Sequence, residues 1–214
     1  MLQKQPFEPT FDDKFATIVH DLCTQGFSIY DHFLSPLIIH NLAHEARSLH
    51  ENGAFRHARI GHGRSLQLRP EVRNDQILWL DTENPSAIQV PYFQDLETLR
   101  HAINRNLFMG LFEFEGHFAI YPPGARYQMH YDRFVGTMER LVTTILYLND
   151  HWQECDGGAL SIHAGNTQTD LRLPMDILPI AGRLVTFISG DFPHEVQPAS
   201  RDRISLTGWF RARP

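Results

Sequence analysis

The second half of the chain is a series of short runs rich in β-forming residues, and this series is what most constrains the fold. From His117 onward such runs recur about every 8–12 residues, with turn residues between them, and this spacing is typical of a double-sheet sandwich or barrel. We therefore predict an all-β core with flanking α-helices (an α+β chain), folded as a double-stranded β-helix, or jelly-roll. The predicted strands are His117–Tyr121, Tyr127–Asp132, Arg140–Leu148, Ala159–His163, Ile177–Ile180, Arg183–Ser189, His194–Gln197 and Ile204–Phe210.

The first half of the chain is predicted to be mainly helical. Three segments carry apolar residues at helical spacing and are bounded by capping or stop signals. They run from the capping box of Thr10 and Asp13 to Gly26, from Ser35-Pro36 to about His50, and from Pro91 through Tyr92, Leu96, Leu99 and Ile103. Short strands are expected at Phe27–Asp31 and Ile77–Leu80. We expect the helices to pack on the outside of one sheet.

No linker or internal repeat separates the two halves, so we predict one domain over residues 1–214. Residues 1–116 would form a helical support with some strands, and residues 117–211 the jelly-roll core.

Composition narrows the functional classes. The 214 residues are 42% hydrophobic, enough to build a core. A net charge of −6 disfavours a nucleic-acid partner. Cys23 and Cys155 form no CxxC pair, which indicates a reducing compartment. There is no apolar signal segment at the start and no run long enough to span a membrane. We expect a soluble cytoplasmic protein with no membrane partner; its oligomeric state is not predicted.

A candidate metal site comes from one His-x-Asp triplet. If Tyr127–Asp132 is a strand, His130 and Asp132 lie on the same face and offer two adjacent ligands. A third ligand would come from a neighbouring strand, and His194 is the candidate. Two histidines and one carboxylate leave three coordination positions open, which suits a non-haem Fe(II) oxygenase better than a structural zinc site.

A candidate anion site lies nine residues after His194. Arg203 enters an apolar run, and burial of an arginine is costly unless it meets an anion. A dicarboxylate co-substrate could bind the metal at one end and pair with this guanidinium at the other, with Tyr147 donating its hydroxyl. The rival cation, Arg201, is interpreted as solvated or paired with an acid.

These motifs together resemble those of Fe(II)/2-oxoglutarate dioxygenases, and most closely the prolyl 4-hydroxylases of the hypoxia-sensing type and their bacterial relatives. The resemblance extends from about Phe33 to Phe210. It rests on Leu49-His50-x-x-Gly53-x-Phe55, Arg73-x-Asp75-x-Ile77-x-Trp79, His130-x-Asp132, Tyr147-Leu148-Asn149, Gly157-Gly158-x-Leu160 and Pro193-His194-Glu195-Val196-Gln197-Pro198 with Arg203.

The resemblance implies a role for each matching residue. It implies that His130, Asp132 and His194 bind Fe(II), and that Arg203 and Tyr147 hold the distal carboxylate of 2-oxoglutarate. It places Tyr121, Tyr127, Thr207 and Trp209 around the co-substrate, and Arg73, Asp75 and Arg140 against a peptide substrate. The implied reaction uses O2 and 2-oxoglutarate, with ascorbate as a reductant, to hydroxylate a proline of a protein target, giving succinate and CO2. The loops Ile60–Pro70 and Arg133–Glu139 follow the family least, so the target stays open.

Several alternative functions fit the same sequence. A hydroxylase of a small molecule or free amino acid would use the same motifs. A cupin-type metal protein without 2-oxoglutarate is the second class, since Gly190-Asp191-x-x-His194 faintly resembles a cupin segment, but a cupin has no need for Arg203. A catalytically silent binding module is a third. Of the other histidines, His163 is the exception, because it follows Gly157-Gly158-Ala159-Leu160-Ser161-Ile162 on a predicted barrel strand and could approach the metal region; we interpret it as a non-ligand. The rest, including His117, are expected in helix, loop or outer-face positions.

Overall fold

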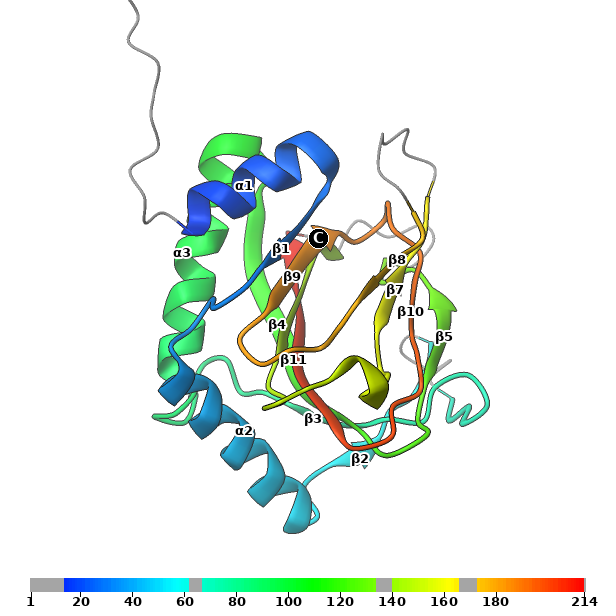
Figure 1. The fold of residues 1–214 in the computed structure, drawn as a ribbon. Helices are drawn as coiled ribbons and strands as arrows, with labels where there is room; N and C mark the ends of the chain where they lie inside the picture. Colours follow the sequence, from blue (N-terminus) through cyan, green and yellow to red (C-terminus); the bar gives the residue numbers. More distant parts are fainter. Residues whose placement is uncertain (1–13, 62–66, 134–139, 166–172, 214) are drawn as a thin grey trace, which may run out of the picture.

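Two antiparallel sheets facing each other form the centre of the molecule (Figure 1). The structure is a computed structural model that describes residues 14–61, 67–133, 140–165 and 173–213. The larger sheet has the order β1 (Phe27–Tyr30), β9 (Leu184–Ile188), β6 (Arg140–Tyr147), β11 (Arg203–Ala212), β4 (Leu111–Tyr121), β3 (Gln76–Trp79), β2 (Arg56–His57). The smaller sheet has the order β5 (Tyr127–His130), β10 (His194–Val196), β7 (Leu160–Ile162), β8 (Met175–Ile177). This is the jelly-roll arrangement that the strand spacing predicts.

Strand ends differ from the predicted ones where pairing, rather than side-chain type, sets them. β4 begins at Leu111 instead of His117, because its ladder with β11 continues to that residue. β8 covers Met175–Ile177 and ends before Pro179, which has no N–H to contribute to a ladder. β5 ends at His130, where its pairing with His194 on β10 ends, so Asp132 lies beyond the strand. The short strand β2 and a 3-10 turn at Glu154–Asp156 were not predicted.

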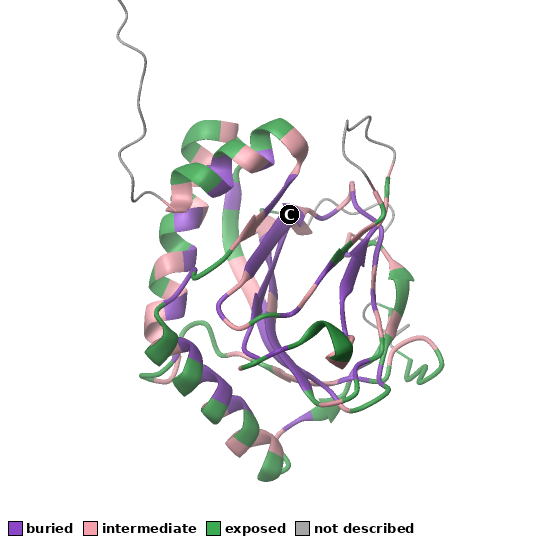
Figure 2. Cartoon of the chain, in the orientation of Figure 1, coloured by how far each residue is buried: buried purple, intermediate pink, exposed green. Residues whose placement is uncertain are grey.

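Three helices cover the outer face of the larger sheet, as predicted (Figures 1 and 2). They are α1 (Lys14–Gln25), α2 (Pro36–Glu51) and α3 (Val90–Leu107). Each turns its buried stripe inward; on α3 that stripe is the predicted set Tyr92, Leu96, Leu99 and Ile103. At the start of α2 the Ser35 hydroxyl accepts a hydrogen bond from the Ile38 N–H, at 3.4 Å. The predicted capping box at Thr10 and Asp13 lies outside the described residues.

The apolar core has two parts. One lies between the helices and the larger sheet and includes Leu42, Leu99 and Phe118. The other lies between the two sheets and includes Phe187, Leu160 and Tyr147. The second part leaves a pocket open between the sheets. None of the helices in the described ranges is long and apolar enough to cross a membrane. Cys23 and Cys155 are both free and exposed.

Candidate active site

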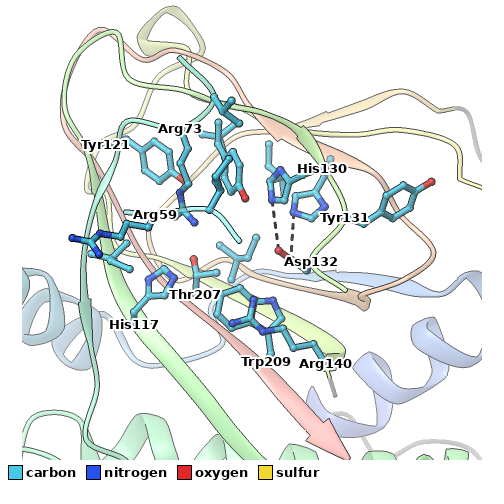
Figure 3. A pocket seen from close by; sticks show the side chains of 18 of the residues that line it. Arg59, Arg73, His117, Tyr121, His130, Tyr131, Asp132, Arg140, Thr207 and Trp209 are labelled. Carbon is cyan, nitrogen blue, oxygen red and sulfur yellow. Dashed lines mark ion pairs between the residues drawn. The ribbon is translucent and has the colours of Figure 1, made fainter. Parts of the chain in front are cut away.

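A cavity of about 340 Å³ lies between the sheets (Figure 3). β3, β4, β6 and β11 of the larger sheet form one wall, and β5, β7 and β10 of the smaller sheet form the other. It is lined by Arg59, Ile60, Gly61, Val72, Arg73, Ile77, Trp79, His117, Tyr121, Tyr127, His130, Tyr131, Asp132, Arg140, Ile145, Leu160, His194, Val196, Arg203, Thr207 and Trp209.

The three predicted metal ligands converge in this cavity. His130 ends β5, His194 begins β10, and these two residues are paired in the ladder. The Asp132 carboxylate lies 3.6 Å from His130 Nε2 and 3.5 Å from His194 Nε2. One ligand atom from each residue lies within 4.8 Å of the others. The predicted reason for this convergence, alternation along one strand, was wrong, because Asp132 is not in the strand; the bend after His130 brings the carboxylate to the imidazoles.

Backbone carbonyls orient both imidazoles. Nδ1 of His130 lies 2.8 Å from Gln128 O, and Nδ1 of His194 lies 3.0 Å from Phe192 O. A carbonyl only accepts, so each Nδ1 carries the proton and each Nε2 presents a lone pair. Burial lowers the pKa of His194 to about 4, despite the opposing charge of Asp132, so the ring is neutral at pH 7. A neutral imidazole with a fixed tautomer is the form that binds a metal.

The surroundings of the Asp132 carboxylate keep it ionised and fix its position. Burial by itself would raise the pKa of Asp132, but the positive charge that His194 and His130 carry when protonated, together with the Trp209 indole, holds that pKa far below its usual value. Thr143 Oγ1 donates to Asp132 Oδ2 at 2.9 Å, and Ser189 Oγ lies 2.8 Å from Thr143 Oγ1. Both hydroxyls are fully buried. Sequence reasoning did not find this pair of supporting residues, because its members lie on β6 and just past β9.

Arg203 is a buried cation with no acidic partner among the described residues. Arg203 is 2% exposed, and its Nε donates a hydrogen bond to the Gly158 carbonyl oxygen at 2.8 Å. Nη2 has no hydrogen-bond partner, and neither has the buried hydroxyl of Tyr147, whose ring centre lies 4.9 Å from the guanidinium. Burial raises the pKa of Tyr147, so its hydroxyl stays protonated and can donate. These orphaned donors fit a carboxylate.

The other predicted co-substrate residues lie around the same cavity. Tyr121, Tyr127, Thr207 and Trp209 all line it, and the Tyr127 ring stacks on His130 at 3.5 Å between centroids. Arg201, the rival of Arg203, is paired instead with Asp156 at 3.3 Å, as interpreted from the sequence.

The predicted substrate residues divide into two kinds. Arg73 and Arg140 line the cavity, and the Arg140 guanidinium lies 3.6 Å from the centre of the Trp209 ring. Asp75 does not line it: its side chain is fully buried and accepts two hydrogen bonds from Arg73, at 2.8 and 2.6 Å. Because Arg73 occupies both carboxylate oxygens, the structure gives Asp75 the role of orienting Arg73, and its direct contact with a substrate stays a prediction.

His117 is the main residue that sequence reasoning missed. It was expected outside the site, but it is 3% exposed and lines the cavity. The signal was present in the alternation of β4, since His117 and Tyr121 are four residues apart and therefore share a face. Trp79 and Arg59 were also not singled out as cavity residues. His163 is not a ligand; it lies 3.1 Å from Glu195 and does not line the cavity.

Comparison with known proteins agrees with this geometry. Residues 116–211 match the 2OG-Fe(II) oxygenase superfamily. The hypoxia-inducible factor prolyl hydroxylase of Caenorhabditis elegans is 30% identical over 204 residues, which cover 90% of this chain and 27% of that protein. Egl nine homolog 1 of Homo sapiens is 30% identical, over 90% of this chain and 45% of that protein. The chain thus spans about a quarter to a half of the length of these relatives.

Solved structures give a fuller match. The prolyl-4-hydroxylase of Pseudomonas putida has a TM-score of 0.81 and 42% identity, covering 94% of this chain and all of that one. A prolyl hydroxylase from Trichoplax adhaerens, solved with a peptide fragment of the hypoxia inducible factor oxygen degradation domain, has a TM-score of 0.80 and 26% identity, covering 92% and 88%. The chain therefore belongs to the 2OG-Fe(II) oxygenase superfamily, and within it to the prolyl hydroxylases.

Proposed function

We propose that this protein is an Fe(II)- and 2-oxoglutarate-dependent dioxygenase that hydroxylates a prolyl residue of a protein target. One observation carries the proposal: a face of three metal ligands and a buried, unpaired arginine line the same cavity. A metal alone accounts for the first feature, but only an anionic co-substrate accounts for the second.

The donor set fits Fe(II). His130 Nε2, His194 Nε2 and the Asp132 carboxylate would hold the ion, leaving room for other ligands. When bound, Fe(II) supplies the activation of O2, with one oxygen atom going to the C–H bond and the other to the succinate formed as 2-oxoglutarate loses CO2. The protein's own part is to fix the tautomer of both imidazoles through their Nδ1 hydrogen bonds and to hold the carboxylate in place through Thr143.

The orphaned donors fit 2-oxoglutarate. Arg203 Nη2 and the Tyr147 hydroxyl would bind its distal carboxylate, which neutralises the buried guanidinium. Tyr121, Tyr127, Thr207 and Trp209 would then surround the rest of the molecule, with the apolar side chains of Ile145, Leu160 and Val196 excluding water. Ascorbate would act only as an external reductant.

The mouth of the cavity fits an extended peptide. Arg73 and Arg140 are fixed there by their acidic partners Asp75 and Glu115, and the half-exposed Trp79 adds an apolar surface. A proline ring would pack on this aromatic surface, and the neighbouring backbone carbonyls would accept hydrogen bonds from the two guanidinium groups. The similarity to the prolyl hydroxylases of Pseudomonas putida and Trichoplax adhaerens supports a prolyl target. A cytoplasmic location, and the absence of nucleic-acid and membrane partners, remain part of the proposal.

The test is a direct assay. The purified protein with Fe(II), 2-oxoglutarate and ascorbate is expected to form succinate, and to form more when proline-centred peptides are added. Mass spectrometry should then find one added oxygen atom on the proline. Succinate formation stimulated by a free amino acid and not by any peptide would favour the small-molecule alternative. No succinate under any condition would favour a metal protein of the cupin type.

A further inference from the structure

The cavity is lined by a buried histidine, His117, that neither the metal site nor the carboxylate site uses. The His117 ring lies between two tryptophans, with centroids 5.0 Å from Trp79 and 5.6 Å from Trp209. Figure 3 shows it beside Thr207, its partner across the β4–β11 ladder, and turned toward the cavity.

The structure determines which hydrogen-bonding role Nε2 of His117 can have. Nδ1 of His117 lies 3.2 Å from Phe118 O, and since a carbonyl only accepts, Nδ1 carries the ring proton. Burial, helped by the nearby charge of Arg73, lowers the pKa of His117 to about 4, so the ring is neutral at pH 7. Nε2 is therefore an acceptor. The hydrogen bonds of the described residues include one from the His117 ring, at Nδ1, and none at Nε2, and the residue lines the cavity.

The position of this acceptor favours the substrate over the co-substrate. Along β11, Thr207 lies four residues from Arg203, which is about 13 Å at the usual rise of a strand. The rings that touch His117 belong to the outer part of the cavity, where Trp79 is 50% exposed and a bound chain would enter. A carboxylate anchored at Arg203 leaves this acceptor unused.

We propose that His117 Nε2 accepts a hydrogen bond from a backbone N–H of the substrate, next to the target proline. Proline has no N–H itself, so the donor belongs to a neighbouring residue. The bond would fix the register of the peptide while the Trp79 and Trp209 rings exclude water from it. His117 would thus be a specificity-determining residue that recognises the backbone of the peptide through this hydrogen bond. This inference rests on the proposed prolyl hydroxylation.

The experiment combines backbone N-methylation of the substrate with two variants. The peptide that gives the most succinate in the direct assay is synthesised with a single N-methyl group at each amide flanking the proline, and at one remote amide as the control. His117→Leu removes the acceptor and keeps an apolar side chain in place, whereas His117→Gln keeps an acceptor. Thermal unfolding checks that both variants fold, and separate KM values are measured for the peptide and for the co-substrate.

In the wild-type protein, methylation at one flanking amide should raise the peptide KM about tenfold, as expected for loss of a buried hydrogen bond, while remote methylation has no effect. In His117→Leu this penalty should disappear, and in His117→Gln it should be partly retained. A second readout avoids variants: with Zn(II) in place of Fe(II), the ¹⁵N resonance of His117 Nε2 should shift on addition of the unmodified peptide and not of the N-methylated one.

Two results would overturn the inference while leaving the proposed function intact. One is an equal N-methyl penalty in wild type and His117→Leu. The other is a His117→Leu variant that binds the co-substrate more weakly but the peptide as tightly as wild type does. If the wild-type protein hydroxylates no peptide at all, the proposed function fails, and this inference fails with it.

Discussion

At the scale of single residues, the site is marked by buried polar atoms that have no hydrogen-bond partner. Arg203 Nη2 and the Tyr147 hydroxyl have no partner, whereas the Asp132 carboxylate has several. A folded protein satisfies nearly all its buried polar groups, so an orphaned pair marks the place of a ligand. The two kinds of buried group should therefore respond differently to substitution.

Replacement of Arg203 by Met should weaken 2-oxoglutarate binding and stabilise the ligand-free protein. Loss of a charge-assisted bond should raise the dissociation constant about 10- to 100-fold. A buried charge without its counter-ion destabilises the fold, so the ligand-free variant should unfold at a temperature about 2–4 °C higher if about 1 kcal/mol is relieved. Calorimetry measures both. Arg201→Met is the control, and equal loss of affinity in the two variants would contradict the assignment.

Replacement of Thr143 by Val should lower the affinity for the metal. The hydroxyl that donates to Asp132 is lost while the shape of the side chain is kept, and loss of such a supporting bond typically costs about tenfold or more in metal affinity. Titration with Mn(II) measures it. The matched control is Thr186→Val, because the Thr186 hydroxyl is equally buried but has no partner. That control should keep metal affinity and gain about 1 kcal/mol of stability; a loss of affinity in both variants would point to general damage to the sheets.

At the scale of helices and strands, the sequence predicts what depends on local pattern. The apolar stripe of α3 and the alternation of strands and turns in the second half of the chain follow from spacing alone. Asp132 shows the limit. Its approach to the histidines depends on where the β5–β10 ladder ends, and no property of residues 127–132 encodes that end. The support from Thr143 and Ser189 depends in the same way on strands 46 residues apart in sequence.

His117 and Asp75 show two further limits of prediction from the sequence. Alternation along β4 was sufficient to place His117 on the same face as Tyr121, but the excess of histidines made each single histidine uninformative. For Asp75 the resemblance gave the right neighbourhood, but its burial behind Arg73 is a property of packing that the sequence does not show.

The start of α2 gives a prediction at this scale. Ser35→Ala removes the side-chain oxygen that caps the Ile38 N–H and should destabilise the protein by about 1 kcal/mol in urea unfolding. Ser48→Ala, inside the same helix, should be neutral or slightly stabilising, since alanine has the higher helix propensity. Because α2 is remote from the cavity, metal affinity should be unchanged in both variants; a change would show that the helix layer affects the site.

At the scale of the whole molecule, the buried histidines link global stability to pH. The pKa values of His117 and His194 fall from 6.5 to about 4 on folding. Between these values the unfolded chain binds more protons than the folded protein, so the free energy of unfolding is largest above about pH 6.5 and falls as the pH is lowered. Each group adds a slope of up to about 1.4 kcal/mol per pH unit.

Urea unfolding of the metal-free protein at several pH values between 4 and 7 measures this slope. The His117→Leu variant should show a clearly smaller slope, since one of the two groups is gone. An unchanged slope in that variant would mean that His117 is protonated as easily in the folded protein as in the unfolded chain.

The distribution of the site over both sheets has a mechanical consequence. Arg203 and Tyr147 belong to the larger, helix-backed sheet, while His130 and His194 belong to the smaller one, which none of the described helices covers. A ligand that binds iron at one end and Arg203 at the other therefore links the smaller sheet to the larger one. Its binding energy would be transmitted to the β5–β10 pair, and amide hydrogens there should exchange with solvent more slowly in the loaded protein. The smaller sheet would then be more rigid in the loaded protein than in the ligand-free one.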